Sequence, residues 1–344
     1  MWSMRFEELL NRFEEGDWLK TVEKLLPEIH QVDRNATQVW FRFFPLKFFR
    51  YLQENQDKWD EVIRRFQIKG NFQLKNQIDS SHKFLYGHRF WKEVKEALIE
   101  KSEAFDDEQD LQSLALSVAD LAAKKTGVDR SLTLGISLVG LMTIVQAGFE
   151  NFKNSEGKIF LNSEWAKKSP DQIIKERAKD DSQGILGFLR TIDKQYSVIF
   201  DESSRTGRFK AYLNEEITSA AARCNVKTDE RCLEGPIPVE CKSAACGSCW
   251  IGILGGQEKL SEVQRLERKR MKFFGYNQPD ESKPFLRLAC QAKVQGNVTI
   301  VIPPWNGVFG KDIYGIEEEV LEGATTSARR NREIIREVVK NKLT

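Results

Sequence analysis

The sequence lacks the features that mark several large classes of protein. Its 53 basic and 51 acidic residues leave a net charge of +2. Because a general binder of polyanions needs a concentrated basic face, we expect no nucleic acid partner. There is no G-x-G-x-x-G fingerprint, no P-loop and no C-x-x-C-H haem attachment in the chain. These absences leave no visible nucleotide, flavin or haem domain.

Histidine is scarce as well, with only His30, His82 and His88 in 344 residues. His82 and His88 lie six positions apart, which does not place them on one face of a helix, so we expect capping or surface positions rather than a paired metal site. The E-x-x-H pairs that di-iron helix bundles use are missing too. We therefore identify no catalytic residues, and an enzyme is the less favoured interpretation.

Targeting signals and long hydrophobic runs are also nearly absent. The first eight residues have no apolar core and become acidic at once, so we expect no secretory signal. The exception is residues 131–149, a run of nineteen residues without a charge. Its length is borderline for a membrane span, and it contains glycines and hydroxyl residues. We predict a helix buried in a helical domain, with membrane insertion as the alternative.

Cysteine is present in a pattern that carries chemistry. Four of the six cysteines follow the spacing C-x4-C-x2-C and then a distant C, at Cys241, Cys246, Cys249 and Cys290. This spacing is typical of a plant-type [2Fe–2S] site, which needs four thiolate ligands. Structural zinc is the alternative, but zinc sites favour paired C-x2-C hooks and only one such pair occurs. The pattern also favours a reducing compartment, so we expect a cytoplasmic protein, or one peripheral to a membrane complex.

Hydrophobic periodicity divides the chain and predicts an α+β fold. Residues 1–193 carry helical patterns, and residues 194–315 contain short alternating β-rich runs. We predict a hairpin from 196–200 and 207–213, a short helix at 215–223, strands at 250–254 and 298–302, and a charged helix at 259–272. Residues 316–344 are predicted to be a charged helical tail. The prediction is thus an all-α N-terminal domain, a β-rich domain and a tail.

Some helix boundaries in the first part can be predicted from local signals. Asn35 or Thr37 is a candidate cap for the helix that carries the aromatic stripe at 40–51, and Pro45 should kink or divide that helix. We expect the stripe to be core on one side, with a partner or membrane-surface contact as the alternative. Residues 79–81 are a candidate cap for a helix that runs to Lys101. We predict a last helix at 185–192.

From about Tyr196 to Pro304 the chain resembles a plant-type or adrenodoxin-like [2Fe–2S] ferredoxin of β-grasp fold. The resemblance is carried by the order of elements, by Cys241–Cys249, and by Cys290 within Arg-Leu-Ala-Cys-Gln. It covers about a third of the chain. It implies one [2Fe–2S] cluster, a one-electron carrier, and Cys241, Cys246, Cys249 and Cys290 as the ligands.

The sequence departs from the family pattern at several places. The family usually has glycine where this chain has Ala244, and the gap between Cys249 and Cys290 is nearer the adrenodoxin-like length. An insertion occupies 227–239. We expect Cys224 to be a buried thiol and Cys232 a loop thiol, and neither to be a ligand.

The expected partners are protein redox partners, namely a reductase and an acceptor. Residues 195–315 contain 17 Lys and Arg against 14 Asp and Glu, a difference of +3, and a basic run lies at 265–272. This charge differs from the acidic surface that the resemblance implies, so we expect a partner with an acidic face. The helical domain would select that partner. The alternatives are a subunit of a larger redox complex, and an enzyme whose helical domain holds an active site fed by the cluster.

Overall fold

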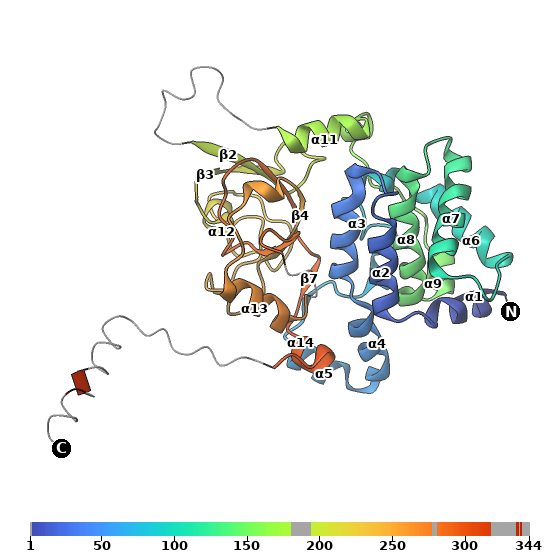
Figure 1. The fold of residues 1–344 in the computed structure, drawn as a ribbon, viewed down its shortest axis with the longest axis horizontal. Coiled ribbons are helices and arrows are strands. Elements are labelled where there is room, and N and C mark those ends of the chain that lie inside the picture. The colour runs from blue at the N-terminus through green and yellow to red at the C-terminus, as the bar shows by residue number, and fades with distance from the viewer. Residues whose placement is uncertain (1, 180–193, 277–280, 318–334, 337, 339–344) are drawn as a thin grey trace.

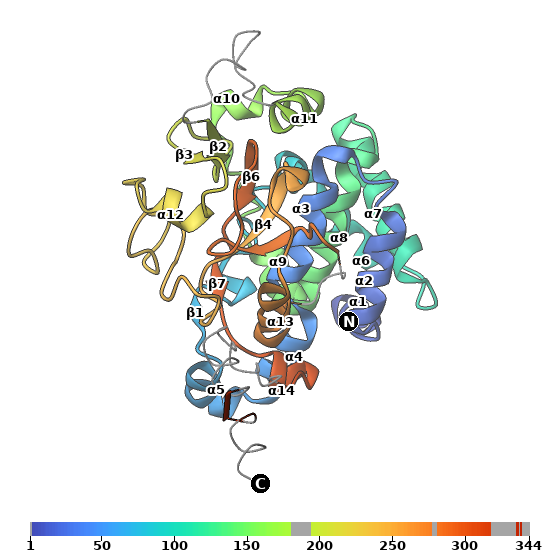
Figure 2. The ribbon, with the colours of Figure 1, turned by 60° about the vertical axis from the view of Figure 1, so that its left-hand side comes forward.

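The chain folds with its helices on one side and a mixed sheet on the other, which confirms the predicted α+β layout (Figures 1 and 2). A computed structural model describes residues 2–179, 194–276, 281–317, 335–336 and 338. The helix predicted at 185–192 and most of the predicted C-terminal tail lie outside these residues. No helix in the described ranges is long and apolar enough to cross a membrane.

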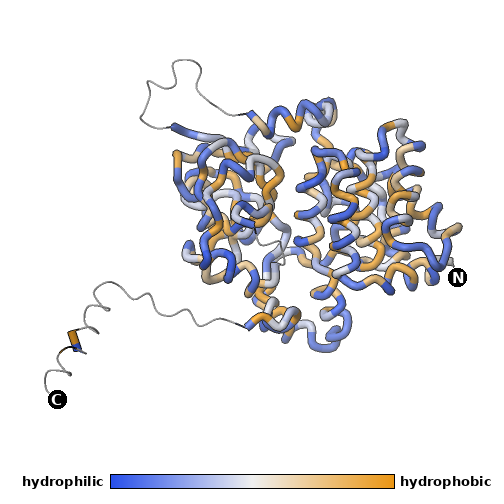
Figure 3. The backbone as a smooth tube through the Cα atoms, viewed as in Figure 1, coloured by the Kyte–Doolittle hydropathy of each residue, from blue (hydrophilic) through white to orange (hydrophobic). Residues whose placement is uncertain are grey.

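The helical half is built around α8 (Ser131–Ala147), which is buried along nearly its whole length. The uncharged run at 131–149 is therefore a core helix, as predicted. Figure 3 shows hydrophobic and hydrophilic residues alternating along the helices that surround it. The helices of this half are α1 (Trp2–Asn11), α2 (Glu15–Leu25), α3 (Gln31–Phe43), α4 (Leu46–Glu54), α5 (Trp59–Arg65), α6 (Trp91–Glu103), α7 (Leu111–Thr126), α8, α9 (Phe149–Asn154), α10 (Ser163–Ala166) and α11 (Pro170–Ala178), with short 3-10 turns between some of them.

The boundaries of α3 and α4 confirm one local prediction and correct another. Pro45 does divide the aromatic stripe, because α3 ends at Phe43 and α4 begins at Leu46. The cap of α3, however, is His30, whose ring accepts a hydrogen bond from Val32 N, and Thr37 lies buried inside the helix.

The predicted start of the next long helix was also wrong, because α6 begins only at Trp91. Asp79 does not cap it. Its carboxylate accepts hydrogen bonds from the Trp91 indole, the Ser155 hydroxyl and Gly157 N. These contacts hold distant segments together, and the residues before α6 form turns followed by a 3-10 helix at Tyr86–Phe90.

The second half forms a five-stranded sheet in the order β3-β2-β6-β4-β5. The predicted hairpin is present as β2 (Gln195–Ile199) and β3 (Arg208–Tyr212), which pair antiparallel, and β2 runs parallel to β6 (Val298–Val301). β4 (Trp250–Gly255) lies between β6 and β5 (Leu286–Leu288). The short helix is α12 (Ile217–Ala221), and the charged helix α13 (Arg265–Phe274) begins later than predicted, because Leu260 forms a β-bridge with Val294.

The two halves share one hydrophobic core rather than meeting at a thin interface. The Phe43 ring lies edge-on to Trp250, with 4.8 Å between ring centroids, and Trp305 donates its indole hydrogen to Phe43 O at 2.7 Å. At Gly252 an added Cβ would lie 2.4 Å from Val39 Cγ1, so the backbone of β4 touches α3 directly. A two-stranded sheet of β1 (Lys69–Gly70) and β7 (Trp305–Asn306) joins the halves a second time, and α14 (Gly310–Tyr314) packs against α4.

Candidate iron–sulfur site

The cysteine loop, Cys241 to Cys249, enters β4 through a series of left-handed turns. Lys242, Ala244 and Gly247 have φ values of 54°, 59° and 71°. Only glycine adopts this conformation without strain, so Ala244 makes its turn with a Cβ present, as the sequence required. Because of these turns, Ser243 N and Ala245 N both donate to Cys241 Sγ, at 3.4 and 3.3 Å. Such N–H groups stabilise negative charge on sulfur.

The four candidate ligands meet as two linked pairs. Cys241 contacts Cys246 through their side chains, and Cys249 contacts Cys290 in the same way. Cys249 also lies within electrostatic range of Cys246, which links the pairs. No three His, Cys, Asp or Glu side chains among the described residues are grouped as ligands of a single ion. Two thiols for each of two irons is the arrangement that a [2Fe–2S] cluster needs.

The two pairs differ in their exposure and in their acidity. Cys249 and Cys290 are buried, whereas Cys241 and Cys246 are partly exposed. The hydrogen bond with Cys290, together with burial, raises the pKa of Cys249 well above its ordinary value. That same bond lowers the pKa of Cys290 to about 7. Burial also raises the pKa of Cys246. At Cys241 burial opposes ionisation, but the hydrogen bonds from residues 243, 245 and 246 lower the pKa overall.

Cys290 reaches the loop because strand β5 is fixed on both sides. Ala289 N donates to Cys249 O at 2.9 Å, which extends the β4–β5 pairing to this candidate ligand. On the other side the buried Arg287 guanidinium binds both carboxylate oxygens of Glu267 on α13, at 2.8 and 2.9 Å. Glu267 also accepts from Leu288 N. The strand that carries the fourth cysteine is therefore anchored by a buried bidentate ion pair.

Aromatic rings cover the inner side of the loop. The Trp250 ring stacks on Tyr276 with 3.7 Å between centroids, and both are buried. An added Cβ at Gly247 would lie 2.9 Å from the Phe274 ring, so this position leaves no room for a side chain. Trp250, which directly follows Cys249, is completely buried behind the loop.

The insertion before the loop is tied to both halves of the molecule. The Arg231 side chain binds Asp229, Asn306 Oδ1 and Pro303 O. Glu240, the residue before the first cysteine, forms an ion pair with Lys69 of β1 at 2.6 Å. The predictions for the two other cysteines were only partly right. Cys232 is a loop thiol but is buried and donates to Pro236 O, whereas Cys224 is half-buried rather than buried.

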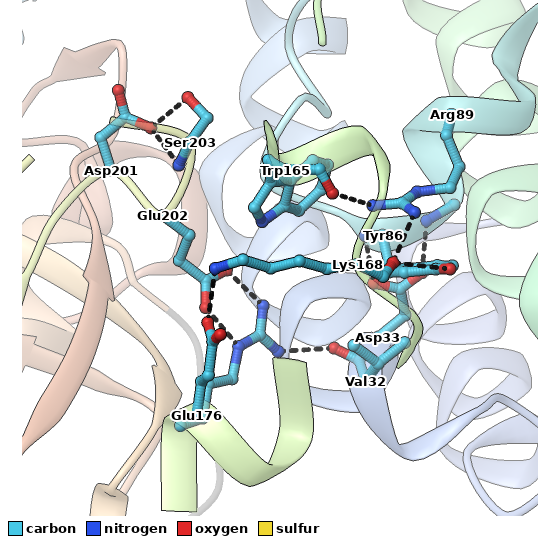
Figure 4. Close-up of polar contacts among 12 residues, drawn as sticks. Val32, Asp33, Tyr86, Arg89, Trp165, Lys168, Glu176, Asp201, Glu202 and Ser203 are labelled. Carbon is cyan, nitrogen blue, oxygen red and sulfur yellow. Dashed lines mark hydrogen bonds and ion pairs between the residues drawn. The ribbon is translucent and has the colours of Figure 1, made fainter. Parts of the chain in front are cut away.

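A second polar group, away from the cysteines, lies between the halves (Figure 4). The buried Asp33 carboxylate accepts from Tyr86 N and Gly87 N at 2.6 and 2.7 Å, and burial raises its pKa to about 6. Arg177 donates to Val32 O and forms a bidentate ion pair with Glu202 of the sheet half. This group fastens α3, α11 and the β2–β3 turn together, and no sequence motif indicated it.

The predicted capping or surface positions of His82 and His88 were wrong. His82 and His88 are completely buried and lie with their Nδ1 atoms 2.9 Å apart. Phe160 N donates to His88 Nε2, so His88 Nδ1 carries the proton and donates to His82, whose Nε2 donates to Ile78 O. Both rings are therefore neutral, which agrees with their lowered pKa values. The fold, not helical spacing, brings them together.

The residues of the loop fit an iron–sulfur cluster by their chemistry. Four thiols meet in two linked pairs, two backbone N–H groups point at one sulfur, and a rigid aromatic layer lies behind. Comparison with protein families gives a match to the 2Fe-2S iron-sulfur cluster binding domain over residues 216–295. The comparisons with curated proteins and with solved structures found no match. Residues 216–295 are therefore a ferredoxin-type domain that binds a [2Fe–2S] cluster and serves electron transfer.

Proposed function

We propose that this chain is a one-electron transfer protein in which a fixed helical half positions a β-grasp [2Fe–2S] domain before its redox partners. In this proposal residues 1–193 are the helical domain, 194–315 the ferredoxin domain and 316–344 a tail. Cys241, Cys246, Cys249 and Cys290 hold the cluster, which supplies one-electron chemistry. The electrons are exchanged with a reductase and an acceptor protein in a reducing compartment such as the cytoplasm.

The observation that carries this proposal is the unequal exposure of the two cysteine pairs. Cys249 and Cys290 are closed off by β4, β5 and the aromatic layer, whereas Cys241 and Cys246 lie partly exposed. Lys242, Ser243 and Ala245 between them are exposed too. The 241–246 edge is therefore the side on which a partner protein can approach the cluster closely.

The surface near this edge supports a partner with an acidic face. Helix α13 carries Arg265, Arg268, Lys269, Arg270 and Lys272, and its one acidic side chain, Glu267, is buried against Arg287. Its last turn lies against the cysteine loop, since Phe274 contacts Gly247. Positive charge next to a redox centre increases the rate of encounter with a negatively charged partner.

The helical half contributes rigidity in this proposal. Its contacts with the sheet half include the Phe43–Trp250 pair, the β1–β7 pairing and the Arg177–Glu202 ion pair. Trp250 directly follows Cys249, so the packing of Phe43 fixes the strand that carries a ligand. A rigid attachment keeps the distance between the cluster and a docked partner constant, which favours a fixed redox protein over a tethered one.

The test is the spectrum of the full-length protein purified without oxygen. We expect the visible absorption of a [2Fe–2S] centre, two irons and two sulfides per chain, and a one-electron paramagnetic signal after reduction. The Cys246→Ser variant should lose most of this absorption. Cys224→Ser is the matched control and should keep it, because Cys224 lies outside the two pairs. Normal iron content in Cys246→Ser would contradict the ligand assignment.

A further inference from the structure

A large cleft lies where the helical half meets the sheet half, and its lining includes no residue of the cysteine loop. Its volume is about 960 Å³, and residues of both halves line it. The helical side contributes Phe43, Phe84 and Trp165, and the sheet side contributes Phe200 of the β2–β3 turn and residues 300–304 of β6 and beyond. Small-molecule sites in proteins are commonly clefts of about 300–1,000 Å³ between domains.

The charges of the cleft balance, which favours an uncharged ligand. Among its acidic residues, Glu202 is paired with Arg177, and Asp229 with Arg231. The charges of the two remaining acidic residues, Asp201 and Glu230, are balanced by those of Lys83 and Lys227. A charged ligand would gain no net attraction here and would lose its hydration, which is costly.

The walls favour a flat ring that can also accept hydrogen bonds. Three lining aromatic residues are at least partly exposed, Phe84 and Phe160 of the helical half and Phe200 of the sheet half, and their flat apolar faces can pack against a planar ring. A donor group lies among them, the ammonium of Lys83, which is 6.0 Å from the centre of the Phe160 ring. A carbonyl oxygen on the edge of a planar ring would satisfy both features.

A series of ring contacts connects the cleft with the cysteine loop. Phe84 lies 5.9 Å from Phe43, and Phe43 lies 4.8 Å from Trp250, which directly follows Cys249 in the sequence. Phe43 and Phe84 both line the cleft. The lining of the cleft is therefore in packing contact, through Phe43 and Trp250, with the strand that follows the buried Cys249.

We propose that this cleft binds a neutral, planar carbonyl compound of the quinone class. The neutral, planar and carbonyl-bearing character follows from the lining of the cleft, whereas the choice of a redox-active compound rests on the proposed function. The exposed 241–246 edge would then serve protein partners, and the cleft would serve a small molecule.

The test is the binding of tetramethyl-1,4-benzoquinone to the full-length protein, measured by equilibrium dialysis. This quinone has no free ring position for thiol addition, so the cysteines do not interfere. We expect saturable binding of one molecule per chain. Thr206→Trp, which fills the cleft from the β2–β3 turn, should weaken binding at least tenfold. Arg205→Trp is the matched control from the same turn, because Arg205 does not line the cleft, and it should leave binding unchanged.

A second pair of variants examines the hydrogen bond. Lys83 and Lys158 both lie near the Phe160 ring, at 6.0 and 5.7 Å, but only Lys83 lines the cleft. Lys83→Met should weaken binding about tenfold, as the loss of a hydrogen bond from a charged donor does, and Lys158→Met should not. Absence of saturable binding, or binding that Thr206→Trp leaves intact, would overturn the proposal.

Failure of the cleft proposal can be distinguished from failure of the proposed electron-transfer function. A protein that shows the [2Fe–2S] spectrum but does not bind the quinone overturns the cleft proposal alone. A protein that binds the quinone at the cleft, and in which no cluster can be formed, retains the binding site and overturns the electron-transfer function.

Discussion

The two halves of the molecule bury polar groups for different purposes. In the helical half the buried Asp33 and the His82–His88 pair bind backbone groups of neighbouring loops, at Tyr86, Gly87, Ile78 and Phe160. In the sheet half the buried thiols of Cys249 and Cys290 lie beside a strand that the buried Arg287–Glu267 ion pair holds in place. The buried polar groups thus fix the conformation of loops in the helical half, and in the sheet half they position candidate ligands.

The largest effect on the free energy of unfolding is expected for the buried ion pair of the sheet half. Replacing Arg287 by Met leaves the Glu267 carboxylate buried without its counter-ion, and such a change costs about 3–5 kcal/mol of unfolding free energy. Urea unfolding of protein with matched iron content would measure this. The double variant Arg287→Met/Glu267→Leu should recover most of the loss, because no unpaired charge then stays buried. Equal loss in the single and double variants would show that packing, not charge, is decisive.

The second largest effect on the free energy of unfolding is expected at the contact between the two halves. A methyl group at Gly252 would lie 2.4 Å from Val39 Cγ1, so Gly252→Ala should destabilise by about 1–3 kcal/mol through overpacking. Val39→Ala in the same protein removes the opposing methyl groups and should restore part of the loss. Thermal or urea unfolding of the three variants measures the coupling. Strictly additive losses would contradict direct contact between α3 and β4.

The helical half should differ from the sheet half in its response to acid. Burial lowers the pKa of His88 to about 4, so the unfolded chain binds the proton first as pH falls, and stability is lost between about pH 6.5 and pH 4. The loss from His88 alone is about 2 kcal/mol between pH 7 and pH 5. The groups that face His88 are His82, Lys83, Asp79 and Arg89.

His88→Gln isolates this contribution. Asp33 acts in the opposite direction, since its raised pKa of about 6 makes the folded state bind the proton first between about pH 4 and pH 6. Both proteins contain Asp33, so the difference in unfolding free energy between them at pH 7 and at pH 5 reports the histidine. The variant should lose less stability on acidification than the parent protein. Parallel losses would exclude His88 as the titrating group.

The cysteine loop could be predicted because the residues that identify it lie close together in the sequence. Cys241, Cys246 and Cys249 lie in nine consecutive residues, and the turns between them are set by the loop itself. The hairpin and the division at Pro45 are local in the same sense. The burial of the run at 131–149 was predictable because a helix without a charged face is normally buried on all sides.

The contacts between the halves could not be predicted in this way. β1 is only two residues long, and its partner β7 lies more than two hundred positions later, so neither has a periodic signal. The fit of Gly252 against Val39 and the His82–His88 pair depend on the complementarity of distant segments. Sequence patterns show which face of a helix or strand is apolar. They do not show which two faces pack against each other, and these contacts depend on that.

The smallest effect is expected where the halves meet at the exposed surface. Arg205 of the β2–β3 turn and Glu164 of α10 form an ion pair at 3.0 Å, and their side chains are 87% and 66% exposed. Exposed pairs contribute little because water and salt screen them, so Glu164→Gln should change the unfolding free energy by less than about 0.5 kcal/mol. Urea unfolding at low and at high salt measures this. A larger, salt-sensitive loss would mean that surface charge, rather than the shared core, holds the helical half against the cluster domain.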